Sequence, residues 1–269
     1  MIEASDATDD GGTVAKLPNG WLVHQLNSAE TSFMYSELFE SNQLPVWLSD
    51  LPSQATLVDV GANVGLFALL VSALCPRLSV VAFEPIPIAC AVLRRNFDQH
   101  GILGKVLQLA IGAEEASDVP FGWYPKTTML SGFNADPERA LATMQRVAQR
   151  LGSVDDTGAK QNGPSFAERL ELRELRCEVQ PLRHLFRELG LTKVDILKID
   201  VEGWELQVLE GLDEQAWKAV RRVLVEVDSL HLATIQKLLR SRGFGIETYE
   251  SPLLEGTGFQ SVFAKREYT

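Results

Sequence analysis

Residues 56–85 of the chain read TLVDVGANVGLFALLVSALCPRLSVVAFEP, and this stretch decides the fold class. Its first and last apolar runs have the length and the β-branched content of buried strands. Between them lie a turn with two glycines and an apolar run long enough for a helix. A strand, a helix and a second strand in succession form the unit of a parallel sheet. The stretch therefore predicts the first two strands of an α/β fold.

The alternation of apolar strands and helices continues along the rest of the chain. Further strands are expected at residues 105–112, 194–203, 221–228, 245–250 and 259–267, and helices at 88–101, 183–190, 205–212 and 233–243. Uninterrupted apolar strands are typical of a parallel sheet that helices cover on both faces. The loop between the last two strands is too short for a crossover helix, so the final strand must run antiparallel. We expect a mostly parallel, seven-stranded sheet with an antiparallel last strand.

The chain divides into three parts. Residues 1–16 are polar and acidic, and we expect them to be a disordered lead-in. Residues 17–50 are expected to form an N-terminal hairpin and a cap helix, and residues 51–269 the main domain. An insertion at about 121–176 interrupts the alternation and is expected to cover the ligand site, beyond the carboxyl ends of the strands.

Local patterns support these divisions. The sequence Pro-Asn-Gly at residues 18–20 predicts the turn of the hairpin, because Asn-Gly suits the positive φ angles of tight turns. Within the insertion, residues 137–152 have one apolar helical face, and residues 153–165 read as a mobile polar loop. Residues 177–182 then predict a strand that follows the insertion.

Composition excludes two classes of partner. The net charge is −11 and the pI near 4.9, whereas binding to nucleic acid requires a basic surface, so we expect no nucleic-acid partner. The longest apolar run, LFALLVSALC, is about half of what a membrane span needs, so we expect no membrane partner. Cys75, Cys90 and Cys177 lack metal-ligand spacing and cannot all pair. A reduced, cytoplasmic location is the simplest interpretation.

The turn and the acid after it indicate the ligand. Gly61 and Gly65 allow the backbone to turn sharply beside a ligand, and Asn63 tolerates a left-handed conformation. Glu84 ends the next strand about 20 residues later, where an acid accepts hydrogen bonds from ribose hydroxyls. The spacing G-x-N-x-G differs from the dinucleotide pattern G-x-G-x-x-G and disfavours a pyrophosphate. S-adenosylmethionine has a ribose and no phosphate, and Asp59 could pair with its ammonium group.

Three segments carry a resemblance to a known family. LVDVGANVGLFALL, AFEPIPIACAVLRRNF and above all VDILKIDVEGWELQVLEGL resemble the FkbM-type methyltransferases, a branch of the Rossmann-like, class I enzymes that use S-adenosylmethionine. LPNGWLVHQLNSAETSFMYSELFE and WYPKTTMLSGFNAD resemble the subgroup found in polyketide and nonribosomal peptide assembly lines. The resemblance implies methyl transfer to a hydroxyl oxygen of a polyketide or peptide intermediate, free or tethered to an acyl carrier protein. It assigns the cofactor site to Asp59, Gly61, Asn63, Gly65 and Glu84.

Methylation of an alcohol requires a group that removes the hydroxyl proton as the new bond forms. His231 follows the fifth parallel strand and has a side chain whose ordinary pKa suits a base near neutral pH. Glu202, after the fourth strand, could orient that imidazole or be the base itself. Asp200 is expected to face the methyl donor and position the acceptor, and Lys198 to pair with one of these acids.

Other roles are assigned on weaker patterns. As the assembly-line resemblance suggests, Tyr35, Tyr124 and Ser131 are candidates for the substrate pocket. Our prediction includes no metal, but Asp200 and Asp228 follow adjacent strands and could hold magnesium, as in catechol-type methyltransferases.

Three alternative functions stay open at this point. The chain could bind S-adenosylmethionine without catalysis, or be a magnesium-dependent small-molecule O-methyltransferase. A nicotinamide-dependent oxidoreductase is disfavoured by the turn spacing and by the antiparallel last strand. Docking of an acidic carrier protein would need a basic patch, for which the pairs at 94–95 and 221–222 are candidates.

Overall fold

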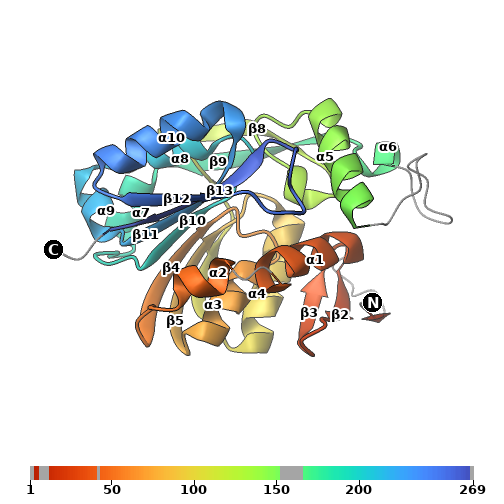
Figure 1. The fold of residues 1–269 in the computed structure, drawn as a ribbon, viewed down its shortest axis with the longest axis horizontal. Helices are drawn as coiled ribbons and strands as arrows, with labels where there is room; N and C mark the ends of the chain where they lie inside the picture. The colour runs from red at the N-terminus through yellow and green to blue at the C-terminus, as the bar shows by residue number, and fades with distance from the viewer. Residues whose placement is uncertain (1–2, 6–11, 41–42, 152–165, 267–269) are drawn as a thin grey trace.

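A seven-stranded sheet forms the centre of the protein in a computed structural model that describes residues 3–5, 12–40, 43–151 and 166–266. The strand order is β12-β13-β11-β10-β4-β5-β6 (Figure 1). The parallel strands are β4 (Gln54–Val60), β5 (Arg77–Phe83), β6 (Leu103–Leu107), β10 (Ile196–Ile199) and β11 (Arg222–Asp228). The last strand, β13 (Phe259–Lys265), pairs antiparallel with both β11 and β12 (Gly245–Tyr249), which confirms the expected sheet.

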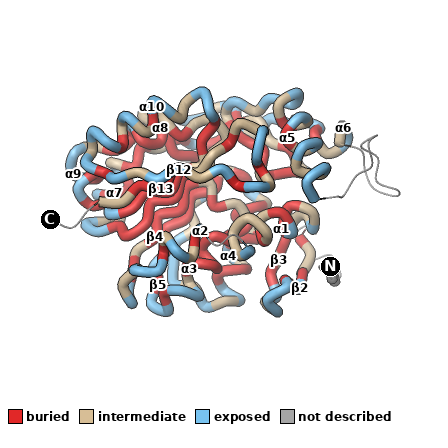
Figure 2. Tube along the Cα trace, in the orientation of Figure 1, coloured by how far each residue is buried: buried red, intermediate tan, exposed pale blue. Residues whose placement is uncertain are grey.

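Helices cover both faces of this sheet, as predicted. One face packs against α3 (Leu66–Leu74) and α4 (Pro87–His100), and the other against α7 (Leu182–Glu188), α8 (Glu205–Glu210), α9 (Glu214–Ala219) and α10 (Ser229–Ser241). In β4 the alternation of side chains sends Leu57 toward α3 and Val58 toward the opposite core. Figure 2 shows the central strands as the most continuously buried part of the chain. No helix within the described ranges combines the length and the apolar composition needed to cross a membrane.

The N-terminal segment forms a separate three-stranded sheet. Its strands β1 (Glu3–Ser5), β2 (Thr13–Lys16) and β3 (Leu22–Gln25) are antiparallel. The turn predicted at residues 18–20 joins β2 to β3, and Gly20 has a φ of 89°. The expectation of a disordered lead-in over residues 1–16 is wrong at β1 and β2, because β1 pairs with β2 and β2 pairs with β3. Residues 1–2 and 6–11 lie outside the described residues.

After β3 the chain forms α1 (Ser28–Tyr35), the π-helix η1 (Ser36–Glu40) and α2 (Gln43–Leu48). The predicted cap helix is therefore present, with Asn27 as its N-cap.

The insertion is anchored by a strand that sequence patterns did not predict, β8 (Ala116–Trp123), and by two whose positions overlap the strands expected at residues 105–112 and 177–182. Strands β7 (Ala110–Ile111), β9 (Arg173–Gln180) and β8 form a second small sheet in that order, in which β8 and β9 run antiparallel. Between β8 and β9 lie η2 (Thr128–Leu130), the predicted helix α5 (Pro137–Arg150) and α6 (Phe166–Arg169). The polar loop expected at residues 153–165 lies outside the described residues.

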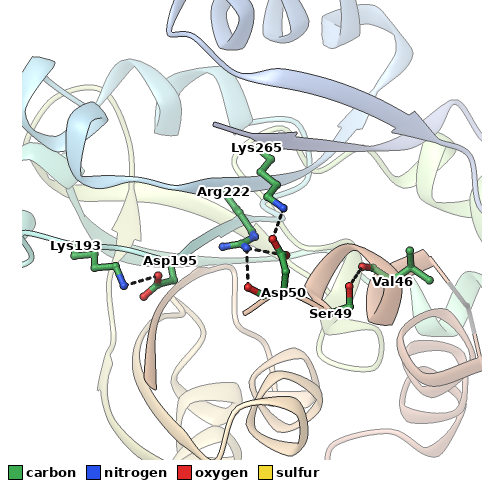
Figure 3. Close-up of polar contacts among 7 residues, drawn as sticks. All are labelled: Val46, Ser49, Asp50, Lys193, Asp195, Arg222 and Lys265. Atoms are coloured by element: carbon green, nitrogen blue, oxygen red, sulfur yellow. Dashed lines mark hydrogen bonds and ion pairs between the residues drawn. The ribbon is translucent and has the colours of Figure 1, made fainter. Parts of the chain in front are cut away.

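Polar contacts tie the amino ends of the central strands together, opposite the expected ligand edge (Figure 3). Asp50 forms ion pairs with Arg222 and with Lys265, and Asp195 pairs with Lys193. Arg222 is only 1% exposed. It cannot contribute to the basic docking patch expected at residues 221–222, because its charge is buried against Asp50.

Candidate active site

A pocket lies at the carboxyl ends of β4, β5, β10 and β11, where ligands of open α/β sheets bind. Residues of α1, η1 and η2 line its opposite wall. It encloses about 1070 Å³ of empty space, open mouth included. We call it the main pocket; Gly61, Asn63, Glu84, Asp200, Glu202 and Glu226 are among its lining residues.

The glycine turn closes one side of the main pocket. Gly61 has a φ of 75°, and a Cβ atom there would lie 1.8 Å from the carbonyl oxygen of Asp200, so the turn packs directly against the end of β10. Asn63 has a φ of 48°, which confirms the left-handed conformation expected for it. Gly65 has a φ of 89°, and a Cβ there would lie 2.5 Å from Leu93. Gly61 and Asn63 line the pocket, whereas Gly65 seats the start of α3 on α4.

Glu84 lies at the end of β5 with its carboxylate in the main pocket and is 4% exposed. Its Oε2 accepts a hydrogen bond from the backbone N–H of Asn63, and its Oε1 accepts one from Ile86, both at 2.9 Å. Burial raises its pKa to about 7, although the two backbone bonds oppose the shift. Each oxygen retains an unused lone pair, so two hydroxyls of a ligand could be bound together.

Asp59, like Gly65, is a predicted cofactor residue that does not line the main pocket. Its side chain is 0% exposed, and its Oδ1 lies 3.3 Å from Nζ of Lys198. Lys198 also lies 3.2 Å from Oδ2 of Asp200 and donates a 2.9 Å hydrogen bond to the carbonyl of Gly61. Burial lowers the pKa of Lys198, but the charges of Asp200 and Asp59 outweigh it and raise the pKa. The predicted pairing of Lys198 with one of the candidate acids is confirmed at Asp200, and Asp59 pairs with the same lysine and supports the turn through it.

Three carboxylates meet on the floor of the main pocket: Asp200, Glu202 and Glu226, called the carboxylate cluster below. One oxygen from each lies within 4.8 Å of the others. Burial, followed by the negative charge of Asp200, raises the pKa of both Glu202 and Glu226 well above the ordinary value. A carboxylate with a raised pKa is a stronger base than an ordinary one, so Glu202 and Glu226 are candidate acceptors for a hydroxyl proton.

Strand register explains why Glu226, rather than Asp228, joins the cluster. Ile199 of β10 lies level with Val225 of β11, so Asp200 is level with Glu226. Asp228 lies two residues farther on, where its carboxylate caps α10 by accepting from the N–H of Leu230 and pairs with Arg139. The alternative metal pair of Asp200 and Asp228 is therefore corrected: within the described ranges, the group suited to a cation is the carboxylate cluster.

The structure places His231 outside the main pocket, where it is not positioned to act as the base. It lies in the first turn of α10 and is not among the described residues that line the main pocket. β11 passes directly into α10 after Asp228, so the helix carries residue 231 past the pocket.

The three predicted substrate residues have different positions. Ser131 lines the main pocket, and its Oγ accepts a 3.1 Å hydrogen bond from the N–H of Tyr124. Tyr124 itself is fully buried in the insertion and does not line the pocket. Tyr35 stacks on Phe39 with ring centroids 4.9 Å apart and belongs to the N-terminal core.

The N-terminal cap contributes to the pocket wall, but through residues other than the predicted Tyr35. Phe33, Met34 and Glu37 line the main pocket, and Glu37 accepts a hydrogen bond from the hydroxyl of Ser251. Burial raises the pKa of Glu37. The available signal was the apolar face that includes Phe33 and Met34, but a helical face does not reveal which surface it covers. Trp204, next to the carboxylate cluster, is a further lining residue that sequence patterns did not single out.

Comparisons with known proteins identify relatives over nearly the whole chain. The family described as "Methyltransferase FkbM domain" matches residues 59–246. The chain is 33% identical over 264 residues to the 31-O-demethyl-FK506 methyltransferase FkbM of Streptomyces tacrolimicus, covering 93% of this chain and 96% of that protein. It is 33% identical to the AMB antimetabolite synthetase AmbE of Pseudomonas aeruginosa, covering 99% of this chain and 13% of the synthetase. The methyltransferase sdnD of Sordaria araneosa is 32% identical over 83% of this chain and 85% of its own length.

Proposed function

Because the chain belongs to the FkbM family of methyltransferases, we propose that it transfers a methyl group from S-adenosylmethionine to a hydroxyl oxygen of a polyketide or peptide natural-product intermediate. The observation that carries this proposal is the presence of Glu84, the glycine turn and the carboxylate cluster in one pocket. Glu84 and the glycine turn suit the methyl donor, and the carboxylate cluster suits the acceptor hydroxyl. The names of the relatives support the reaction type, since one of them is described as a 31-O-demethyl-FK506 methyltransferase.

The donor binds along the ends of β4 and β5 in this proposal. Glu84 accepts hydrogen bonds from both ribose hydroxyls, which extends the two backbone bonds that already orient its carboxylate. Ile86, Leu109 and Ile111 supply an apolar wall of the main pocket beyond it, which suits the adenine ring. The turn at Gly61 would hold the methionine end of the donor, and Asp200 would lie on the side of its methyl group. The acidic residues that line the main pocket favour this positively charged donor.

The acceptor hydroxyl lies over the carboxylate cluster. Its oxygen attacks the methyl carbon, the bond between carbon and sulfur breaks, and the hydroxyl proton passes to Glu202 or Glu226. We assign the role of base to Glu202 and Glu226 together. Both carboxyl groups have raised pKa values, and neighbouring groups that interact take up protons as a pair rather than independently. Asp200, paired with Lys198, positions the acceptor.

A magnesium-dependent reaction is the second candidate, and the geometry of the carboxylate cluster is the observation that favours it. Oxygen ligands from Asp200, Glu202 and Glu226 suit magnesium, which would lower the pKa of a bound hydroxyl. The ammonium group of Lys198, 3.2 Å from Asp200, competes with an ion for that carboxylate. We therefore prefer proton transfer to the carboxylates themselves.

The acceptor is free or tethered to an acyl carrier protein in this proposal. One relative is a much longer synthetase, and this chain matches 13% of its length. That match supports the proposal that a methyltransferase domain of this kind can form part of an assembly line. A carrier protein would meet the surface near Arg94, which is exposed on α4, rather than the buried Arg222.

Calorimetric titration with S-adenosylmethionine, S-adenosylhomocysteine and NADH tests the donor site. We expect both sulfur compounds to bind and NADH not to bind; the reverse preference would end the methyltransferase proposal for this pocket. Methylation of hydroxylated acceptors, free and carrier-bound, followed by mass spectrometry, then tests transfer. Activity that survives EDTA supports the carboxylate base, activity lost to EDTA and restored by Mg²⁺ supports the second candidate, and binding without turnover on any acceptor supports a non-catalytic binding module.

A further inference from the structure

Glu30 is a buried carboxyl group that the proposed reaction does not use. It lies on α1, is 6% exposed, and connects this helix to η2 in the insertion. Its Oε2 accepts a 3.2 Å hydrogen bond from the hydroxyl of Thr128, and its Oε1 accepts a 3.3 Å bond from the N–H of Met129. Two segments about a hundred residues apart in the sequence are thereby joined above the main pocket.

The connection continues into the glycine turn. The Thr128 hydroxyl accepts a 3.2 Å hydrogen bond from Nδ2 of Asn63, whose Oδ1 accepts a 2.8 Å bond from the N–H of Val64. The backbone N–H of Asn63 donates to Glu84. Donors and acceptors therefore form one directed series from Asn63 through Thr128 to Glu30. A carboxylate at its end is the strongest available acceptor for this series.

We propose that Glu30 is a positioning residue for the methyl-donor site: through Thr128 it holds Asn63 in the conformation that orients Glu84 for the cofactor. This inference rests on the proposed function, because it assigns Glu84 to the donor. It adds a residue outside the main domain to the donor machinery and gives the N-terminal cap a function beyond packing.

The structure gives two reasons for a role beyond packing. Asn63 has a positive φ, a conformation that asparagine tolerates better than most residues but still at some energetic cost, so contacts to its side chain help to hold it. Burying the carboxyl group of Glu30 also costs free energy. Burial raises its pKa to about 7, although the hydrogen bonds from Met129 and Thr128 and the charge of Arg169 lower it. An apolar residue would pack α1 more cheaply, but it could not accept from Thr128 and Met129. The helix that Glu30 anchors also brings Phe33 and Met34 into the pocket wall.

Two substitutions at Thr128 form a matched pair for the test. Thr128→Val keeps the shape of the side chain and removes the hydroxyl, whereas Thr128→Ser keeps the hydroxyl. Glu30→Gln keeps the shape of the acid but presents an N–H group to one of its two donors. Ser32→Ala, on the exposed face of α1, removes a hydroxyl that bonds within the helix and serves as the control.

The measurement is calorimetric titration of S-adenosylhomocysteine into each variant at pH 8, with thermal unfolding to verify folding. We expect Thr128→Val and Glu30→Gln each to weaken binding roughly tenfold, as for loss of a buried hydrogen bond. Thr128→Ser and Ser32→Ala should stay within about twofold of the wild type. The double variant Glu30→Gln/Thr128→Val should lose little more than either single variant, because both residues act in one series.

Turnover separates positioning from general damage. Glu30 does not touch the carboxylate cluster in any hydrogen bond or ion pair of the described residues, so the KM for S-adenosylmethionine should rise in Glu30→Gln while kcat stays within about twofold. Affinity retained in Thr128→Val, or losses that add in the double variant, would overturn the inference alone. Absence of binding by the wild type would overturn the proposed function and the inference with it.

Discussion

Replacing Glu84 by glutamine removes the charge at the expected ribose site while keeping the size of the side chain. In the wild type both carboxylate oxygens already accept backbone hydrogen bonds, from Asn63 and Ile86. A glutamine can offer an oxygen to only one of these donors, so its NH₂ group must face the other. The substitution therefore disturbs the turn and removes one charged acceptor from the ligand.

The expected loss of affinity follows from these contacts. A hydrogen bond to a charged group contributes about 1.5–3 kcal/mol, and a buried donor left without an acceptor adds a penalty of similar size. We expect S-adenosylhomocysteine to bind Glu84→Gln about 100-fold more weakly than the wild type, equivalent to about 3 kcal/mol. Isothermal titration calorimetry at pH 8 measures this ratio directly.

The wild type should also show a pH-dependent affinity. Burial raises the pKa of Glu84 to about 7, and the ribose hydroxyls need the ionised form as their acceptor. Binding then releases a proton below pH 7, so the dissociation constant should rise about tenfold between pH 8 and pH 6 and be nearly constant above pH 8. Glu30, whose pKa is also raised to about 7, would shift affinity in the same direction, and Glu30→Gln isolates the part due to Glu84.

Two results would refute this reasoning. Binding by Glu84→Gln within threefold of the wild type would mean that the ligand does not contact this carboxylate. A flat pH profile in the wild type, with no proton released in buffers of different ionisation enthalpy, would mean that Glu84 does not change its ionisation on binding.

Three further predictions concern the turn and the floor of the pocket. Gly61→Ala should abolish ligand binding and lower the melting temperature, because its Cβ would lie 1.8 Å from the carbonyl oxygen of Asp200; normal calorimetric binding would contradict this packing. Glu226→Gln and Glu202→Gln should each lower kcat by about 100-fold or more with little change in donor affinity, as expected for loss of a general base; unchanged kcat in both would exclude these carboxylates from the proton transfer. His231→Ala should retain kcat within about twofold in the same assay, since the residue lies outside the main pocket, and a large loss would return the base to this histidine.

The local parts of the protein were predictable from the sequence. The seven strands of the central sheet, the antiparallel last strand, the turn at residues 18–20 and the helix in the insertion follow from side-chain periodicity and turn chemistry, which act over a few residues. The positions of Gly61, Asn63 and Glu84 in the pocket also follow, because the ends of successive parallel strands meet at one edge. Lys198 was expected to pair with a nearby acid, and side-chain alternation, which places it on the same face of the chain as Asp200, explains why Asp200 is the partner.

Contacts between distant segments could be decided only by the tertiary structure. The register of β10 against β11 sets Glu226, and not Asp228, beside Asp200, and a shift of two residues is invisible in either strand alone. The same applies to the burial of Arg222 against Asp50 and to the bond between Glu30 and Thr128, whose partners lie far apart in the sequence. The sequence by itself determined the fold class and the turn and acid proposed for the donor, because these depend on local patterns. The tertiary structure determined which acids share the pocket floor and which segments cover them, because these depend on register and long-range packing.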